Sequence, residues 1–371
     1  MPALSSRPLS WLLAAVVAAT SVGAACTPVG GKRYSRSLAQ KSLSKLEAPG
    51  LIVGEFTLTK VVDGDTVRVD GLDASLRLLG MDTEETFKSE SNRRAVETDW
   101  DAYLRVKRGK FRPGRIETPM GEVAKAWAKK FFDGSVRVRV ERDHPAEIRD
   151  RFNRYLAYVL VEKDGKWLNF NVESVRAGMS PYYTKYGHSR RYHEQFVAAQ
   201  AEAQAAKRGI WASGIKNYPD YPERFAWWGP RADFIDAFRT ASEGKDNFID
   251  LTHWNAMKLL EEHVGSEVQM LGVISDVRYA ERGPARVMLS YRQFRDFPLI
   301  FFDRDVLVSS GITDKWKQEF VWVTGVPTIY ENKHTKKKQV QIKIDSASQI
   351  RLCPVPGLPP PPALPTAGVG P

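Results

Sequence analysis

The chain of 371 residues has little cysteine and no long hydrophobic run after its first 26 residues. Two cysteines, Cys26 and Cys353, are too few for a disulfide scaffold or a cysteine-rich zinc site. A polytopic membrane protein is excluded because no later stretch approaches the roughly 18 apolar residues of a spanning helix. The sequence also lacks a glycine-rich phosphate loop and a Ser–His–Asp arrangement, and His188 and His193 have no residues beside them that would complete a metal set.

Positive charge is in excess, and it is unevenly distributed. The net charge of +11 favours a polyanionic partner. Residues 51–214 carry 29 Lys and Arg against 24 Asp and Glu, whereas residues 215–350 carry 19 of each. The basic half of the chain is therefore where we expect a nucleic acid to approach.

Residues 1–25 have the pattern of a secretory signal peptide, with Arg7 before a short apolar run and small residues before Cys26. Small residues directly before a cysteine resemble a bacterial lipoprotein signal, which leaves an acylated Cys26. We expect an exported protein of the periplasm or cell envelope, lipid-anchored at Cys26 or otherwise secreted. Plain cleavage would leave Cys26 as a free thiol or let it pair with Cys353. Residues 26–50 are basic and rich in Ser, Gly and Ala, which predicts a flexible tether.

Residues 51–214 alternate between strand and helix signals. Strands are predicted at 55–69, with a turn at Asp63-Gly64, and at 76–79, 135–140 and 155–161. Helices are predicted at 121–132, 171–177 and 189–207, the last being the longest. This order suits a five-stranded barrel with packed helices. The basic segment 87–120 is interpreted as a loop that either follows the backbone of a bound strand or is a solvated insertion.

A set of polar residues lies on or beside the ends of these strands. They are Asp65, Arg77, Asp82, Thr83, Glu85 and Arg154. Carboxylate and carbonyl oxygens suit Ca²⁺ or Mg²⁺, and guanidinium groups bind phosphate oxygens. A remaining carboxylate can take a proton from water. The set therefore favours phosphodiester hydrolysis.

The segments Val62–Val67, Leu76–Thr86 and Asp150–Tyr158 resemble the thermonuclease (staphylococcal-nuclease-like) family over residues 51–211. The resemblance implies an OB-type barrel and Ca²⁺-dependent hydrolysis of DNA and RNA, with 3′-phosphate products and single strands as the expected substrate. Glu84 stands where the family has Pro, and it adds a carboxylate beside Asp82.

The resemblance also implies a role for each matched residue. Asp65 and Asp82 would bind the metal through carboxylates and Thr83 through its carbonyl. Arg77 and Arg154 would hold the scissile phosphate, and Glu85 would orient or deprotonate water. The substrate contacts implied are Arg151 and Tyr182, and packing against the last helix is an equal account of the tyrosines near residue 182.

Residues 215–266 are interpreted as a proline-containing linker and a helical segment, and residues 267–352 as a second, OB-like barrel of five strands. Residues 353–371 form a Pro-rich tail. The second barrel has aromatic and basic residues that would suit a single strand, but the half of the chain that contains it, residues 215–350, carries no net charge. No obligate protein partner is inferred. The rival hypotheses are a non-catalytic nucleic-acid-binding module and a surface interaction protein.

Overall fold

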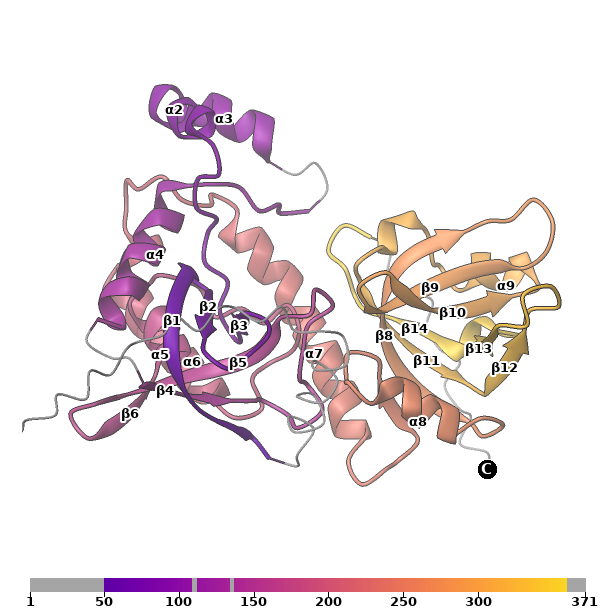
Figure 1. Ribbon diagram of the computed structural model, residues 1–371. Coiled ribbons are helices and arrows are strands. Elements are labelled where there is room, and N and C mark those ends of the chain that lie inside the picture. The colour runs from indigo at the N-terminus through magenta and orange to yellow at the C-terminus, as the bar shows by residue number, and fades with distance from the viewer. Residues whose placement is uncertain (1–49, 109–111, 134–136, 359–371) are drawn as a thin grey trace, which may run out of the picture.

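The computed structural model describes residues 50–108, 112–133 and 137–358. Two β-sheet units lie on either side of the long helix α7 (Tyr221–Ala241), as Figure 1 shows. The expected signal peptide, the tether with Cys26 and most of the Pro-rich tail lie outside the described residues. Within the described ranges, every helix is too short or too polar to cross a membrane.

The N-terminal unit is built on six strands. They are β1 (Ile52–Asp63), β2 (Thr66–Val69), β3 (Leu76–Leu78), β4 (Arg137–Glu141), β5 (Tyr155–Lys163) and β6 (Lys166–Asn169). β1 and β2 form the expected antiparallel hairpin, since Asp63-Gly64 accepts a tight turn. A Cβ atom on Gly64 would lie 2.6 Å from the Thr83 side chain, so this turn needs glycine for space as well.

The first sheet closes into a five-stranded barrel. The sheet has the strand order β3-β2-β1-β4-β5-β6, and a parallel pairing of β3 with β5 closes the ring of β1 to β5 and leaves β6 outside it. In β4, Val138 and Val140 are buried while Arg137 is exposed, which is the period of a strand with one face toward a core. The predicted barrel is confirmed, and β6 adds a hairpin to β5 that the sequence pattern did not indicate.

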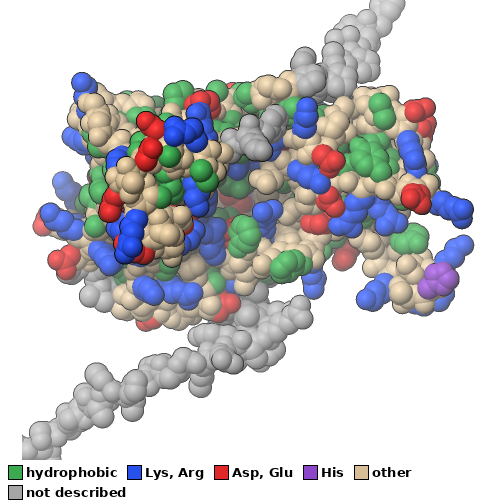
Figure 2. All heavy atoms as spheres, turned by 90° about the horizontal axis from the view of Figure 1, so that it is seen from above, with side chains coloured by type: hydrophobic (Ala, Val, Ile, Leu, Met, Phe, Trp, Pro, Cys, Tyr) green, Lys and Arg blue, Asp and Glu red, His purple; other side chains and the backbone are tan. Residues whose placement is uncertain are grey.

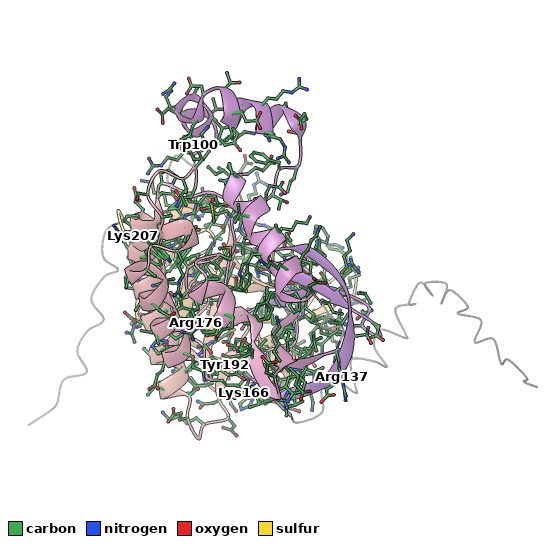
Figure 3. The ribbon with its side chains drawn as sticks, turned by 90° about the vertical axis from the view of Figure 1, so that its left-hand side faces the viewer. Trp100, Arg137, Lys166, Arg176, Tyr192 and Lys207 are labelled. Carbon is green, nitrogen blue, oxygen red and sulfur yellow. The ribbon has the colours of Figure 1, made fainter. Side chains whose placement is uncertain are left out.

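Three helices cover this barrel. They are α4 (Pro119–Phe131), α5 (Phe170–Arg176) and α6 (His193–Ala205), followed by the 3₁₀ turn η1 (Gly209–Trp211). Thr118 caps α4 by accepting from the Gly121 N–H, and Pro119 occupies the first turn, where its missing N–H costs no hydrogen bond. Figure 3 looks onto this side of the unit, with Arg176 and Lys207 labelled near the ends of α5 and α6.

The segment interpreted as a basic loop contains two helices instead, α2 (Glu90–Thr98) and α3 (Trp100–Lys107). Ser89 and Asp99 cap them by accepting from backbone N–H groups at Asn92 and Ala102. The pair forms the upper lobe in Figures 1 and 3, where Trp100 is labelled. The many exposed charges of this segment obscured its helical pattern in the sequence. Its apolar contacts include the buried side chains of Val96 and Tyr103.

Helix α7 is the longest in the described part of the chain, and it takes up much of the proline-containing segment interpreted as a linker. Pro222 stands in its first turn, where proline is tolerated, and Pro230 is inside the helix. Trp227 and Trp228 are buried, with exposed fractions of 6% and 2%. The two tryptophans therefore belong to a packed helix.

The C-terminal unit is a second, mostly antiparallel sheet. Its strands are β7 (Phe248–Asp250), β8 (Val268–Arg278), β9 (Ala285–Arg292), β10 (Arg295–Phe301), β11 (Phe320–Gly325), β12 (Pro327–Glu331), β13 (Lys338–Lys343) and β14 (Ile350–Leu352). Its helical elements are α8 (Ala256–Glu262), α9 (Arg304–Ser309), η2 (Asp314–Trp316) and η3 (Ala347–Gln349).

The second sheet closes on itself through β11 and β12, which form one strand with a short interruption. β11 pairs with β8, and β12, separated from β11 by Val326 alone, pairs with β13. β10 and β13 are parallel, as are β3 and β5 in the first unit. The pairings around the second sheet therefore repeat those of the first barrel.

One buried carboxylate ties α7 to the second unit. Glu319 is fully buried, and it accepts from Trp227 Nε1 at 3.1 Å and from Arg231 Nη1 at 2.5 Å. Arg112 Nη1 lies 2.9 Å from the same carboxylate. Arg231 is itself 1% exposed, so these charges are neutralised by one another and not by water.

A second interface cluster surrounds His253. Its Nε2 lies 3.7 Å from Glu147 Oε1 and 3.9 Å from Asp250 Oδ2, and its ring stacks on His144. Burial lowers the pKa of His253, but the charges of Asp250 and Glu147 outweigh this and raise it. The folded state therefore gains stability that is complete below the ordinary histidine pKa of about 6.5 and is lost as pH rises through the raised value.

We expect His253→Gln to lower the free energy of unfolding more at about pH 5.5 than at about pH 9. The reason is that His253 is fully protonated, and fully ion-paired with Glu147 and Asp250, only at the lower pH. Urea denaturation at both pH values measures this difference. His334→Gln removes an exposed histidine and should change neither value. An equal loss at both pH values for His253→Gln would contradict the assignment.

Candidate active site

Asp65, Arg77 and Asp82 meet at one edge of the first barrel. Thr66 pairs with Arg77 between β2 and β3, and the Leu78 N–H donates to the Asp65 carbonyl, so the register places residues 65 and 77 side by side. The Arg77 guanidinium forms ion pairs with both carboxylates. Each of the three residues is less than a tenth exposed.

The charges in this group stabilise one another. Burial alone would lower the pKa of Arg77, but Asp65 and Asp82 raise it well above its ordinary range. Burial would raise the pKa of Asp65, and the Arg77 charge and hydrogen bond outweigh that effect and lower it. The arginine and Asp65 are therefore charged at neutral pH.

Arg115 joins this group, which the sequence did not indicate. Its Nη2 lies 2.5 Å from Asp82 Oδ1 and its Nη1 lies 3.4 Å from Glu85 Oε1. Lys88 Nζ lies 3.0 Å from the other oxygen of Glu85. Backbone bonds fasten the segment here, since the Thr118 N–H donates to the Glu85 carbonyl at 3.0 Å. This long-range backbone pairing brings residues 85 and 115 together, so no local spacing in the sequence indicates their contact.

Arg154 lies at the start of β5, which pairs with β3, but its side chain bonds to a different carboxylate. Arg154 Nε and Nη2 lie 2.8 Å and 2.7 Å from Asp150 Oδ2. Arg151 is exposed, and its guanidinium lies 4.8 Å from the ring centroid of Phe152, which is itself 53% exposed. This turn presents an exposed aromatic ring beside two arginines, and the sequence reasoning missed Phe152.

Tyr182 is a core residue in the structure. It is 5% exposed, its ring stacks on Phe196 at 4.8 Å, and its hydroxyl accepts from the Ser189 N–H. A side chain this buried does not fit the substrate contact expected for Tyr182. Burial raises the pKa of Tyr183, while the charges of Arg115 and Arg77 act in the opposite direction. Tyr186 is 57% exposed.

Glu84 faces away from the metal-binding candidates. Its carboxylate accepts from the Thr118 hydroxyl, the Tyr218 N–H and the Tyr221 hydroxyl, and burial raises its pKa to about 7. The residue that replaces the family's proline therefore fixes the segment that carries Asp82, Thr83 and Glu85 against the start of α7.

The donors available for a cation are oxygens. No three His, Cys, Asp or Glu side chains in the described ranges form a ready-made metal group, since Arg77 lies between Asp65 and Asp82. Asp63 nevertheless stands beside Asp65 with a buried Oδ1 that accepts no hydrogen bond, and burial and the Asp65 charge raise its pKa to about 6. This surplus of buried negative oxygen fits a hard divalent cation held by Asp65, Asp82 and the Thr83 carbonyl.

The arrangement can bind phosphate and activate water at adjacent positions. A guanidinium carries five N–H donors, so ion pairing leaves Arg77 with donors for a phosphate oxygen. Arg115 forms ion pairs with both Asp82 and Glu85, and it therefore connects Glu85 to the pair of Asp82 and Arg77. A carboxylate next to a bound phosphate is placed to accept a proton from an attacking water.

The sequence of this chain is similar to those of known proteins. The family model described as staphylococcal nuclease homologue matches residues 75–213. A thermonuclease of Staphylococcus intermedius is 32% identical over 164 residues, which are 43% of this chain and 77% of that protein. A thermonuclease of Staphylococcus hyicus is 29% identical over 43% of this chain and 76% of its own length. An uncharacterized protein of Methanocaldococcus jannaschii is 30% identical over 42% of this chain and 70% of its own length.

Proposed function

The chain belongs to the staphylococcal nuclease homologue family, and on that basis we propose that it is a Ca²⁺-dependent nuclease that hydrolyses DNA and RNA. The observation that carries this proposal is the convergence of Asp65, Asp82, Arg77 and Glu85 at one barrel edge. The same edge supplies the phosphate-binding, metal-binding and proton-accepting groups that phosphodiester hydrolysis requires.

Each residue then has a defined part in the reaction. Arg77 and Arg154 bind the non-bridging oxygens of the scissile phosphate and neutralise the charge that grows there. Glu85 accepts a proton from the water whose oxygen bonds to phosphorus. The bond to the 5′-oxygen breaks, the leaving oxygen takes a proton from solvent, and the products carry a 3′-phosphate and a 5′-hydroxyl.

Asp65, Asp82 and the Thr83 carbonyl would hold the Ca²⁺ ion, which when bound supplies positive charge for the phosphate and the attacking water. Arg151, Phe152 and Tyr186 are exposed near the barrel edge or its adjoining turns and would contact the rest of a single strand. A strand with unpaired bases suits these side chains better than a duplex, because stacking requires free base faces.

Digestion of single-stranded DNA by the protein tests this proposal. We expect cleavage with Ca²⁺ and its loss in EDTA, together with a rise in melting temperature when Ca²⁺ is added, since a ligand that binds only the folded state stabilises it. Activity that persists in EDTA would overturn the metal assignment. Binding of the strand without cleavage under both conditions would favour the non-catalytic binding module.

We also propose that the protein is exported and held at a membrane through an acylated Cys26. The support is the sequence of residues 1–26 alone, in which small residues stand directly before the cysteine. A basic tether beside one acyl chain would add attraction to an anionic lipid surface.

A further inference from the structure

Helices α2 and α3 and the segment around Arg115 enclose a cavity of about 250 Å³ beside Glu85. It is lined by Glu85, Lys88, Asn92, Tyr103, Lys107, Arg115, Ile116 and Glu117. Glu85 and Arg115 belong to the candidate active site as well. The cavity therefore opens next to the position proposed for the attacking water.

The cavity walls are fixed by hydrogen bonds to Glu117. The Tyr103 hydroxyl donates to the Glu117 carbonyl at 2.9 Å, and Asn92 Nδ2 donates to the Glu117 carboxylate at 2.9 Å. Glu117 also forms a parallel bridge with Glu85. Helices α2 and α3 are thus connected to the backbone that carries Glu85. The lobe that the two helices form stands above the barrel in Figure 1.

Three cations surround this cavity, and their partners differ. Arg115 and Lys88 are paired with Glu85, whereas Lys107 has no carboxylate within ion-pair distance among the described residues. Lys107 Nζ instead lies 5.9 Å from the ring centroid of Tyr103. Figure 2 looks down on this lobe and shows Lys and Arg side chains over it, with Asp and Glu among them. Lys107 is exposed and lacks a carboxylate partner among the described residues, so its ammonium group is available to bind an anionic group of a ligand.

We propose that this cavity is a subsite for the nucleotide next to the scissile phosphate of a single-stranded substrate. The phosphate of that nucleotide binds Lys107, Lys88 and Arg115. The inference rests on the proposed nuclease function and extends it to substrate length. The volume of about 250 Å³ is below the range of about 300–1,000 Å³ for drug-sized ligands, so the cavity takes at most one nucleotide unit and excludes a duplex.

The test is binding of a fluorescein-labelled single-stranded DNA of about six nucleotides to the whole protein, followed by anisotropy in EDTA over a range of NaCl concentrations. We expect Lys107→Gln to weaken binding about 3- to 10-fold and to reduce the slope of log affinity against log salt by about 0.7, the value for one phosphate contact. Arg105→Gln removes the same charge from the same helix outside the cavity, and it should leave both quantities unchanged.

Failure of the subsite and failure of the nuclease proposal give different results. If the wild-type protein cleaves DNA but Lys107→Gln binds the labelled DNA with wild-type affinity, the subsite is overturned and the nuclease function stands. An equal loss in Arg105→Gln and Lys107→Gln would also overturn it, because general charge would then explain the effect. If binding depends on Lys107 while cleavage is absent, the subsite is supported and the nuclease proposal fails.

Discussion

Glu85→Gln should lower the rate of DNA hydrolysis by about 10² to 10⁴-fold, because an amide oxygen cannot accept the proton of the attacking water. The substitution keeps the shape of the side chain and removes the negative charge between Arg115 and Lys88. The loss should therefore appear in kcat, measured under saturating single-stranded DNA, while the protein stays folded.

Glu90→Gln is the matched control for this variant. Glu90 lies on α2 with its side chain 63% exposed, and its pairs with Arg93 and Arg94 are surface ion pairs. Such pairs contribute little, so this variant should hydrolyse DNA at the wild-type rate. A full rate in Glu85→Gln would remove residue 85 from the reaction.

Glu319→Gln should destabilise the whole protein strongly. The substitution leaves Arg231 and Arg112 without the buried negative charge they share, and Arg231 has almost no access to water. Removing one partner of a buried ion pair typically costs about 3–5 kcal/mol of unfolding free energy. Urea denaturation followed by tryptophan fluorescence measures this directly, since Trp227 donates to the same carboxylate.

The exposed Glu331 gives the comparison for Glu319. Its pairs with Lys336 and Lys338 are 3.8 Å and 3.9 Å long and lie at the surface. Glu331→Gln should therefore change the unfolding free energy by less than about 0.5 kcal/mol. A loss of similar size in both variants would show that burial of Glu319 does not decide its contribution.

Local patterns predicted much of the first barrel. The Asp63-Gly64 turn, the alternation along β4 and the helix predicted at 121–132 depend on neighbours in the sequence, so they can be inferred from it. The order of Asp65, Arg77 and Asp82 along the chain also matched a family pattern. The structure places these three side chains in direct contact.

Features that depend on distant segments were not predictable in the same way. Arg115 reaches Asp82 only because residues 117 and 118 pair with residue 85, and no periodicity records that pairing. The prolines near the start of α7 indicated a linker, yet the helix forms because both of its flanks are covered by other parts of the chain. Tyr182 and Tyr183 are adjacent in sequence, and they pack on different distant residues, Tyr182 on Phe196 and Tyr183 on Trp228.

The hydrogen bonds of Glu84 have a consequence for how this protein can be divided. Two of its three donors, at Tyr218 and Tyr221, come from beyond residue 214, where composition suggests that the nuclease unit ends. A chain cut there would keep the barrel strands but leave the segment between the proposed metal ligands and the proposed base without its anchor. The catalytic unit of this protein is therefore not an interchangeable module, and its shortest self-sufficient form includes the beginning of the helix that joins it to its neighbour.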